Sequence, residues 1–96
     1  MKEDTDKLHN QMLRSKQAES LLLNPLYEES FNLVESSLLK ELTNTNYKEV
    51  ELREELYRRI QLLRDIKSTL TKTIQTGKVA EDKLSKLERA KKLVGL

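Results

Sequence analysis

The sequence contains no cysteine and no tryptophan, and it has only one proline and two glycines among 96 residues. Without cysteine the chain has no disulfide, no thiolate metal ligand and no cysteine nucleophile. So few prolines and glycines leave little to interrupt a helix, and three tyrosines and one phenylalanine supply few of the aromatic residues that favour strands. The composition therefore predicts an all-α chain that is helical over most of its length.

Charge of one sign and long apolar runs are also lacking. Eighteen basic and sixteen acidic residues leave a net charge of only +2, so no chain-wide field attracts nucleic acid or a membrane surface. The longest apolar run, Leu21-Leu22-Leu23, is far shorter than the roughly 20 residues of a membrane span, and the acidic first residues are unlike a secretory signal. We expect a soluble intracellular protein with no membrane partner.

No pattern typical of an active site or cofactor site occurs in the sequence. Glycine-rich phosphate loops, nucleophile elbows and metal-ligand spacings are all missing. The single histidine, His9, stands in a polar segment and is interpreted as a surface residue. Glu28 and Glu29 follow a predicted helix start, where carboxylates interact favourably with the helix dipole. We expect no enzymatic activity, no cofactor, no metal site and no small-molecule substrate.

Hydrophobic periodicity and local punctuation predict a single helical domain over residues 1–96. Asn24-Pro25 is typical of a helix cap and first position, and the polar turn Thr43-Asn44-Thr45-Asn46 separates the next two helices. Gly77-Lys78 has the form of a helix C-terminus. The expected elements are a weakly ordered first helix over residues 1–23, an antiparallel helical hairpin formed by residues 25–42 and 47–76, and a basic C-terminal helix over residues 79–94.

An apolar stripe follows the longest predicted helix with a period of about 3.67 residues, close to that of a straight α-helix. The stripe outruns the shorter helix 25–42, and two helices alone cannot enclose a core. We therefore expect the fold to be completed by oligomerisation or by docking onto a larger partner. The predicted interface consists of Leu52, Leu56, Ile60, Leu63, Leu70 and Ile74, with the row Leu56, Ile60 and Leu63 buried best.

Charged residues gather in two places. Between Glu49 and Arg59 acidic residues precede basic ones by four positions, as in a solvated helix face or in contacts that set the choice of a partner helix. The C-terminal helix is basic, which suits plain solubility, an acidic protein partner or nucleic acid. Nucleic acid is not favoured, because no aromatic residue is interleaved to stack a base. The basic residues are Lys83, Lys86, Arg89, Lys91 and Lys92.

The stretch from Ala18 to Lys78 resembles a family of small helical proteins, themselves uncharacterised, that tailed bacteriophages encode near their head-assembly genes. The matching features are the run from Ala18 to Leu26, a polar turn, the pair Arg53-Glu54 and the segment Ile74-Gln75-Thr76-Gly77-Lys78. The resemblance implies virion assembly as the setting, in the cytoplasm of the infected host cell and/or the virion. It implies no particular functional residues.

These observations predict a non-enzymatic structural protein that docks through its apolar stripes onto itself or onto a phage head, portal or scaffold protein. One alternative is a DNA-binding packaging factor similar to the small terminase subunit. Another is an accessory chaperone or inhibitor that docks a host protein through the same stripe.

Overall fold

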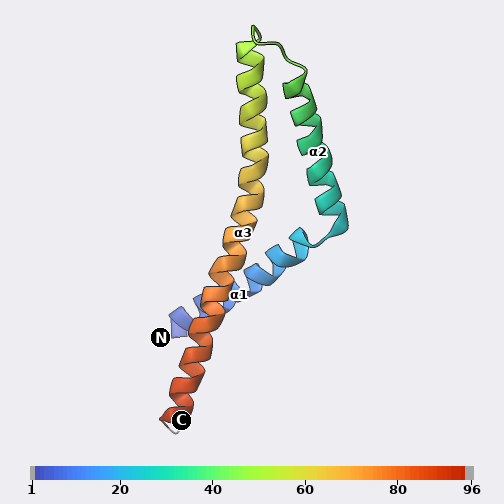
Figure 1. The fold of residues 1–96 in the computed structure, drawn as a ribbon. Helices are drawn as coiled ribbons and strands as arrows, with labels where there is room; N and C mark the ends of the chain where they lie inside the picture. The colour runs from blue at the N-terminus through green and yellow to red at the C-terminus, as the bar shows by residue number, and fades with distance from the viewer. Residues whose placement is uncertain (1, 95–96) are drawn as a thin grey trace. The chain divides into compact units, whose positions relative to one another are not determined.

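The computed structural model describes residues 2–94, with side chains from Asp4 on, and places them in three α-helices without a strand (Figure 1). Helix α1 spans Lys2–Leu22, α2 spans Pro25–Thr43 and α3 spans Val50–Leu93. The all-α prediction is confirmed for these residues. Within them, no helix combines the length and the apolar character needed to cross a membrane.

Helix α2 begins where the sequence offers a cap. The Asn24 side-chain oxygen accepts hydrogen bonds from the backbone N–H groups of Leu26 (2.9 Å) and Tyr27 (3.3 Å), which otherwise have no intrahelical partner. Pro25 occupies the first turn, where its missing N–H costs nothing. The helix ends at Thr43, one residue beyond the predicted end.

Helix α3 begins at Val50 instead of at Tyr47. The reason lies in the preceding turn, where the Asn46 side chain accepts from the Lys48 N–H (2.7 Å) and the Glu49 carboxylate accepts from the Asn46 N–H (3.1 Å). The Glu49 N–H also donates to the Asn46 carbonyl oxygen (3.1 Å), so residues 46–49 form a turn that is tighter than an α-helix and precedes α3.

Helix α3 then runs without a break to Leu93, so the predicted helix end at Gly77 and the separate helix 79–94 are wrong. Gly77 is buried inside the helix. A Cβ atom added there would collide with the Ser15 side chain and lie 2.9 Å from the Gln11 carbonyl oxygen. The glycine therefore permits a close approach of α1 and does not terminate α3.

The chain, expected as a single domain, divides into two compact units. The first combines Met1–Leu21 with Leu70–Leu96. Its described interior is made of small residues, because Ser15, Ala18, Gly77 and Ala80 are buried. The Ser15 hydroxyl donates a hydrogen bond to the Ile74 carbonyl oxygen (3.1 Å), which ties α1 to α3 at this point.

The second unit is Leu22–Thr69. Its buried side chains are larger and apolar, namely Phe31, Leu56 and Ile60. Two polar contacts join α2 to the first half of α3. The Lys67 ammonium lies 5.0 Å from the centre of the Phe31 ring, and Arg64 pairs with Glu35 at 3.4 Å.

Candidate interaction surfaces

The predicted interface stripe on α3 is partly covered by the chain itself. Leu56 is 1% exposed and Ile60 is 3% exposed, so neither presents a surface to a second molecule in this fold. Leu63, Leu70 and Ile74 are half-buried, and Leu52 is exposed. The row predicted to be buried best thus includes two core residues and one at the margin. Any docking surface must be sought among the residues that remain exposed.

One such surface surrounds the connection between α2 and α3, and we call it the turn groove. It is an open groove of about 690 Å³ lined by Leu42, Tyr47, Val50, Arg53, Glu54, Tyr57 and Arg58. Tyr47 is 79% exposed, and Val50 and Tyr57 are also exposed. Tyrosine and arginine are enriched in protein interfaces, because they combine a large contact area with hydrogen-bonding groups. The composition suits a protein partner.

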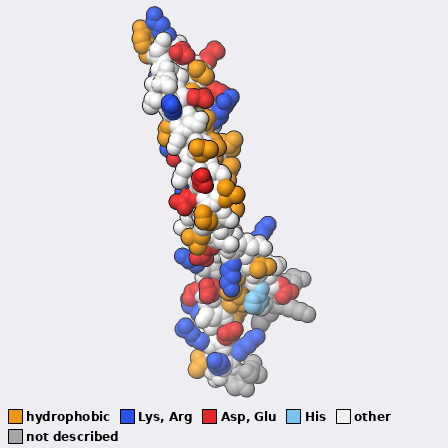
Figure 2. All heavy atoms as spheres, turned by 90° about the vertical axis from the view of Figure 1, so that its right-hand side faces the viewer, with side chains coloured by type: hydrophobic (Ala, Val, Ile, Leu, Met, Phe, Trp, Pro, Cys, Tyr) orange, Lys and Arg blue, Asp and Glu red, His pale blue; other side chains and the backbone are white. Residues whose placement is uncertain are grey.

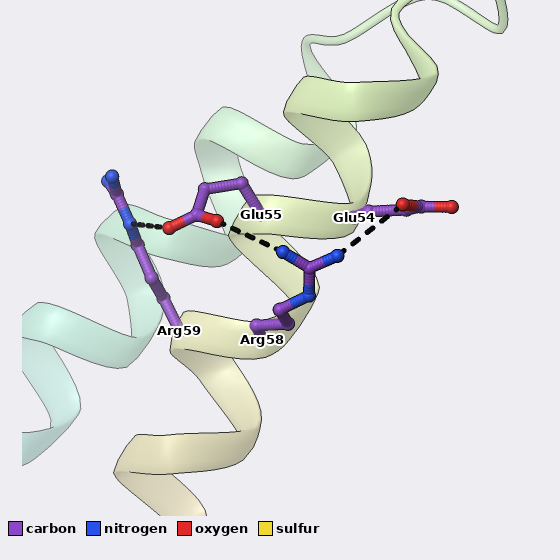
Figure 3. Close-up of polar contacts among 4 residues, drawn as sticks. All are labelled: Glu54, Glu55, Arg58 and Arg59. Atoms are coloured by element: carbon purple, nitrogen blue, oxygen red, sulfur yellow. Dashed lines mark hydrogen bonds and ion pairs between the residues drawn. The ribbon is translucent and has the colours of Figure 1, made fainter.

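Ion pairs along the rim of this groove stay within one helix. Arg58 lies 3.6 Å from Glu54 and 3.5 Å from Glu55, and Arg59 lies 3.3 Å from Glu55 (Figure 3). All four side chains are exposed to solvent by about half or more. Pairs of this kind add only about 0.2–0.5 kcal/mol each to helix stability.

Glu49 and Arg53 are also four positions apart, but their side chains do not pair. The Glu49 carboxylate is used by the Asn46 N–H, and Arg53 instead donates to the Thr45 hydroxyl at 3.4 Å. Arg53 therefore lines the turn groove without a carboxylate partner among the described residues. A partner that offers an acidic group could engage it.

A second surface is the outer face of α2, which sequence analysis missed. Leu26 is 69% exposed and Leu33 is 71% exposed, and Ser30 and Ser37 are exposed between and after them. Figure 2 shows hydrophobic side chains in a row along this part of the molecule. The spacing of seven between the two leucines was a usable signal. It was hidden by the stronger stripe on a neighbouring face of the helix, which contains Tyr27 and Phe31.

The five predicted basic residues of the tail are all exposed on the last turns of α3, but they do not form one face. At about 100° per residue their positions are distributed around the whole helix. Acidic residues are interspersed, since Lys86 pairs with Asp82 at 3.1 Å. In the first unit, Lys91 and His9 line a groove of about 490 Å³ together with Asp4, Thr5, Asp6, Leu84, Leu87 and Glu88.

The described residues contain no group of three or more His, Cys, Asp or Glu side chains that could hold a metal ion. His9, predicted at the surface, is exposed. Comparison with known protein families, with curated proteins and with solved structures finds no match. Function is therefore inferred from the exposed surfaces of the chain.

Proposed function

We propose that this is a non-enzymatic structural protein of tailed-phage virion assembly that docks through apolar helix surfaces onto itself or onto a head, portal or scaffold protein. The observation that carries the proposal is the exposure of large apolar side chains on the Leu22–Thr69 unit. They include Leu26, Leu33, Tyr47, Tyr57, Leu62 and Ile66. Large apolar side chains exposed in this number give assembly an apolar surface to cover.

In this proposal α2 and residues 50–69 act as a helical hairpin, and assembly covers the apolar side chains that the hairpin leaves exposed. The small interior supports the idea, because only five hydrophobic residues of the described chain are buried. A chain with so little private core gains stability by burying more apolar surface against a partner. The phage setting rests on the resemblance of the segment from Ala18 to Lys78, and with it the location in the infected host cell and/or the virion.

The alternative function is DNA binding by a packaging factor. What favours it is the exposure of all five basic side chains near the C-terminal end of α3. Their distribution around the helix weighs against it, because a DNA-binding helix concentrates its cations on the face that meets the phosphates.

Light scattering of the purified chain, alone and mixed with head, portal and scaffold proteins of a tailed phage that carries it, tests the leading proposal. We expect a mass above the 11.2 kDa of one chain, or comigration with one of those proteins. The same chain with Tyr47→Ser and Tyr57→Ser should lose comigration if the turn groove is the docking site. A compact monomer at micromolar concentration that joins no head component would contradict the proposal.

A further inference from the structure

We propose that two copies of this chain pair through the outer faces of their α2 helices, antiparallel and related by a two-fold axis. In this arrangement Leu26 lies opposite Ser37 of the second copy, and Ser30 lies opposite its Leu33. The proposal deepens the assembly function, on which it rests, by naming the occupant of this face and its register.

The four residues form one continuous stripe. Their successive spacings of four, three and four place them on a single face of α2, and all four are exposed. Neither Leu26 nor Leu33 contributes to the interior of the unit, which is built from residues such as Phe31 on another face of the helix. The stripe is therefore free for a second molecule.

Size complementarity selects the second copy and the antiparallel direction. Large and small side chains alternate along the stripe, and the pairs Leu26 with Ser37 and Ser30 with Leu33 share the same midpoint, between residues 31 and 32. A two-fold axis at that midpoint places every leucine against a serine, so that each bulky side chain meets a gap. A parallel pair in register would oppose leucine to leucine and serine to serine, and would hold the helices apart.

The stripe ends within α2, because Leu23, which is 73% exposed, precedes the first residue of the helix and lies outside its periodicity. No carboxylate lies in the stripe, so burying the stripe against a second copy leaves no unpaired negative charge in the interface.

The charge of α2 supplies a distinguishing property. The helix carries Glu28, Glu29, Glu35 and Glu41 against Lys40 alone, and among the side chains that the structure describes only Glu35 of these four forms an ion pair, with Arg64 of α3. Two such helices repel each other, and added salt screens that repulsion. Pairing through an apolar seam should therefore strengthen with salt, whereas binding of nucleic acid would weaken.

Cysteine cross-linking tests the register, because the chain has no native cysteine. Leu26→Cys and Ser37→Cys chains are mixed and oxidised. The proposed register brings position 26 of one copy against position 37 of the other. It separates the two 26 positions by about 16 Å at 1.5 Å per residue, which is beyond disulfide reach. We expect the mixed dimer in large excess over both homodimers. Homodimers in excess, or a random distribution of the three products, would overturn the proposal.

A matched pair of variants tests the contact itself. Leu33→Ser should weaken the dimer about 100-fold, because each copy contributes one leucine and burying one is worth roughly tenfold or more in affinity. Leu13→Ser, a substitution of a leucine that is similarly exposed (57%) but lies on α1, should leave dimerisation unchanged. Circular dichroism verifies that both variants stay helical. The reverse order of effects, or a dimer that weakens as salt rises, would overturn the pairing.

The outcomes separate this inference from the function it rests on. A native chain that remains monomeric but comigrates with a head protein contradicts the pairing and supports virion assembly. A dimer with the predicted cross-link supports the pairing even if no head protein binds.

Discussion

The distance between α1 and α3 in the first unit is set by one missing methyl group. Gly77 sits in the interior of α3 opposite Ser15, and a side chain there would meet both the Ser15 side chain and the Gln11 carbonyl. Close approach also brings the Ser15 hydroxyl to the Ile74 carbonyl. A glycine inside a helix lowers helix stability by about 1 kcal/mol relative to alanine. At this position the glycine allows the close approach of α1 to α3.

Replacing Gly77 by Ala should destabilise the first unit although alanine is the better helix former. The gain of about 1 kcal/mol in helix propensity is smaller than the overpacking cost, which is about 1–3 kcal/mol where backbone must move. Thermal unfolding followed by circular dichroism should show a lower midpoint, with α1 cleaved faster by protease. Thr76→Ala, at the exposed neighbouring position, is the control and should not lower the midpoint. If Gly77→Ala proved more stable than the parent chain, the close crossing would be refuted.

A buried hydroxyl group gives a second prediction at the scale of a residue. The Tyr27 hydroxyl is buried and has no hydrogen-bond partner among the described residues, and its ring lies 6.2 Å from that of Phe31. Tyr27→Phe removes the unsatisfied group and keeps the ring, so stability should stay the same or rise by about 1 kcal/mol. Tyr57→Phe is the matched control, since that hydroxyl accepts a bond from Gln61 and its residue is exposed. Denaturant unfolding of both variants measures the difference. A large loss of stability in Tyr27→Phe alone would show that the hydroxyl has a partner after all.

At the scale of the helices, the sequence predicts those features that neighbouring residues determine, and not those that depend on contacts between residues far apart in the chain. The start of α2 is determined by the adjacent residues Asn24 and Pro25, and the hydrogen bonds of the Asn24 side chain are those expected of a helix cap. The role of Gly77 cannot be predicted from its neighbours in the sequence, because Ser15, whose side chain leaves no room for a Cβ atom there, lies 62 positions earlier. Locally, Gly-Lys is equally typical of a helix end. Only the packing of α1 decides between the two interpretations.

Hydrophobic periodicity also predicted which face of α3 is buried, but it did not predict where along the helix the buried stretch begins and ends. Leu56 and Ile60 are core residues, whereas Leu52 on the same stripe is exposed. The sequence could not show how far α2 covers α3. On α2 itself two apolar stripes compete, and the aromatic residues made the inner one more prominent. The outer stripe of Leu26 and Leu33 became visible only through its exposure.

The two faces of α3 should differ sharply in their tolerance of charge. Ile60→Asp places a carboxylate in the interior of the second unit without a guaranteed cation, which costs several kcal/mol and equals much of the stability of a small domain. The variant should lose helicity or aggregate. Ile66→Asp makes the same substitution at a residue that is 51% exposed and should change stability by about 0.5 kcal/mol at most. Circular dichroism and thermal melts compare the two. An Ile60→Asp chain as stable as Ile66→Asp would mean that the buried face has been assigned incorrectly.

For the whole molecule, the charge distribution separates the two proposed functions. The net charge is only +2, and α3 carries two lysines, Lys91 and Lys92, in its last turn. Cations near a helix C-terminus are stabilised by the helix dipole, which accounts for their position without a ligand. Lys91 also lines a groove with acidic residues in the first unit. An acidic neighbourhood of this kind discourages phosphate binding.

Changing Lys91 and Lys92 together to Ser should therefore leave self-association unaltered and lower stability by less than about 1 kcal/mol, since both side chains are exposed. Neither the native chain nor the variant should bind duplex DNA tightly at physiological salt. Fluorescence anisotropy with a labelled duplex, repeated over a series of salt concentrations, measures this directly. If the native chain bound DNA tightly, if that affinity fell steeply with salt, and if the double substitution abolished it, the basic end of α3 would be a phosphate-binding element. The packaging-factor function would then replace the structural one, because a protein that only assembles through apolar seams has no reason to lose affinity as salt is added.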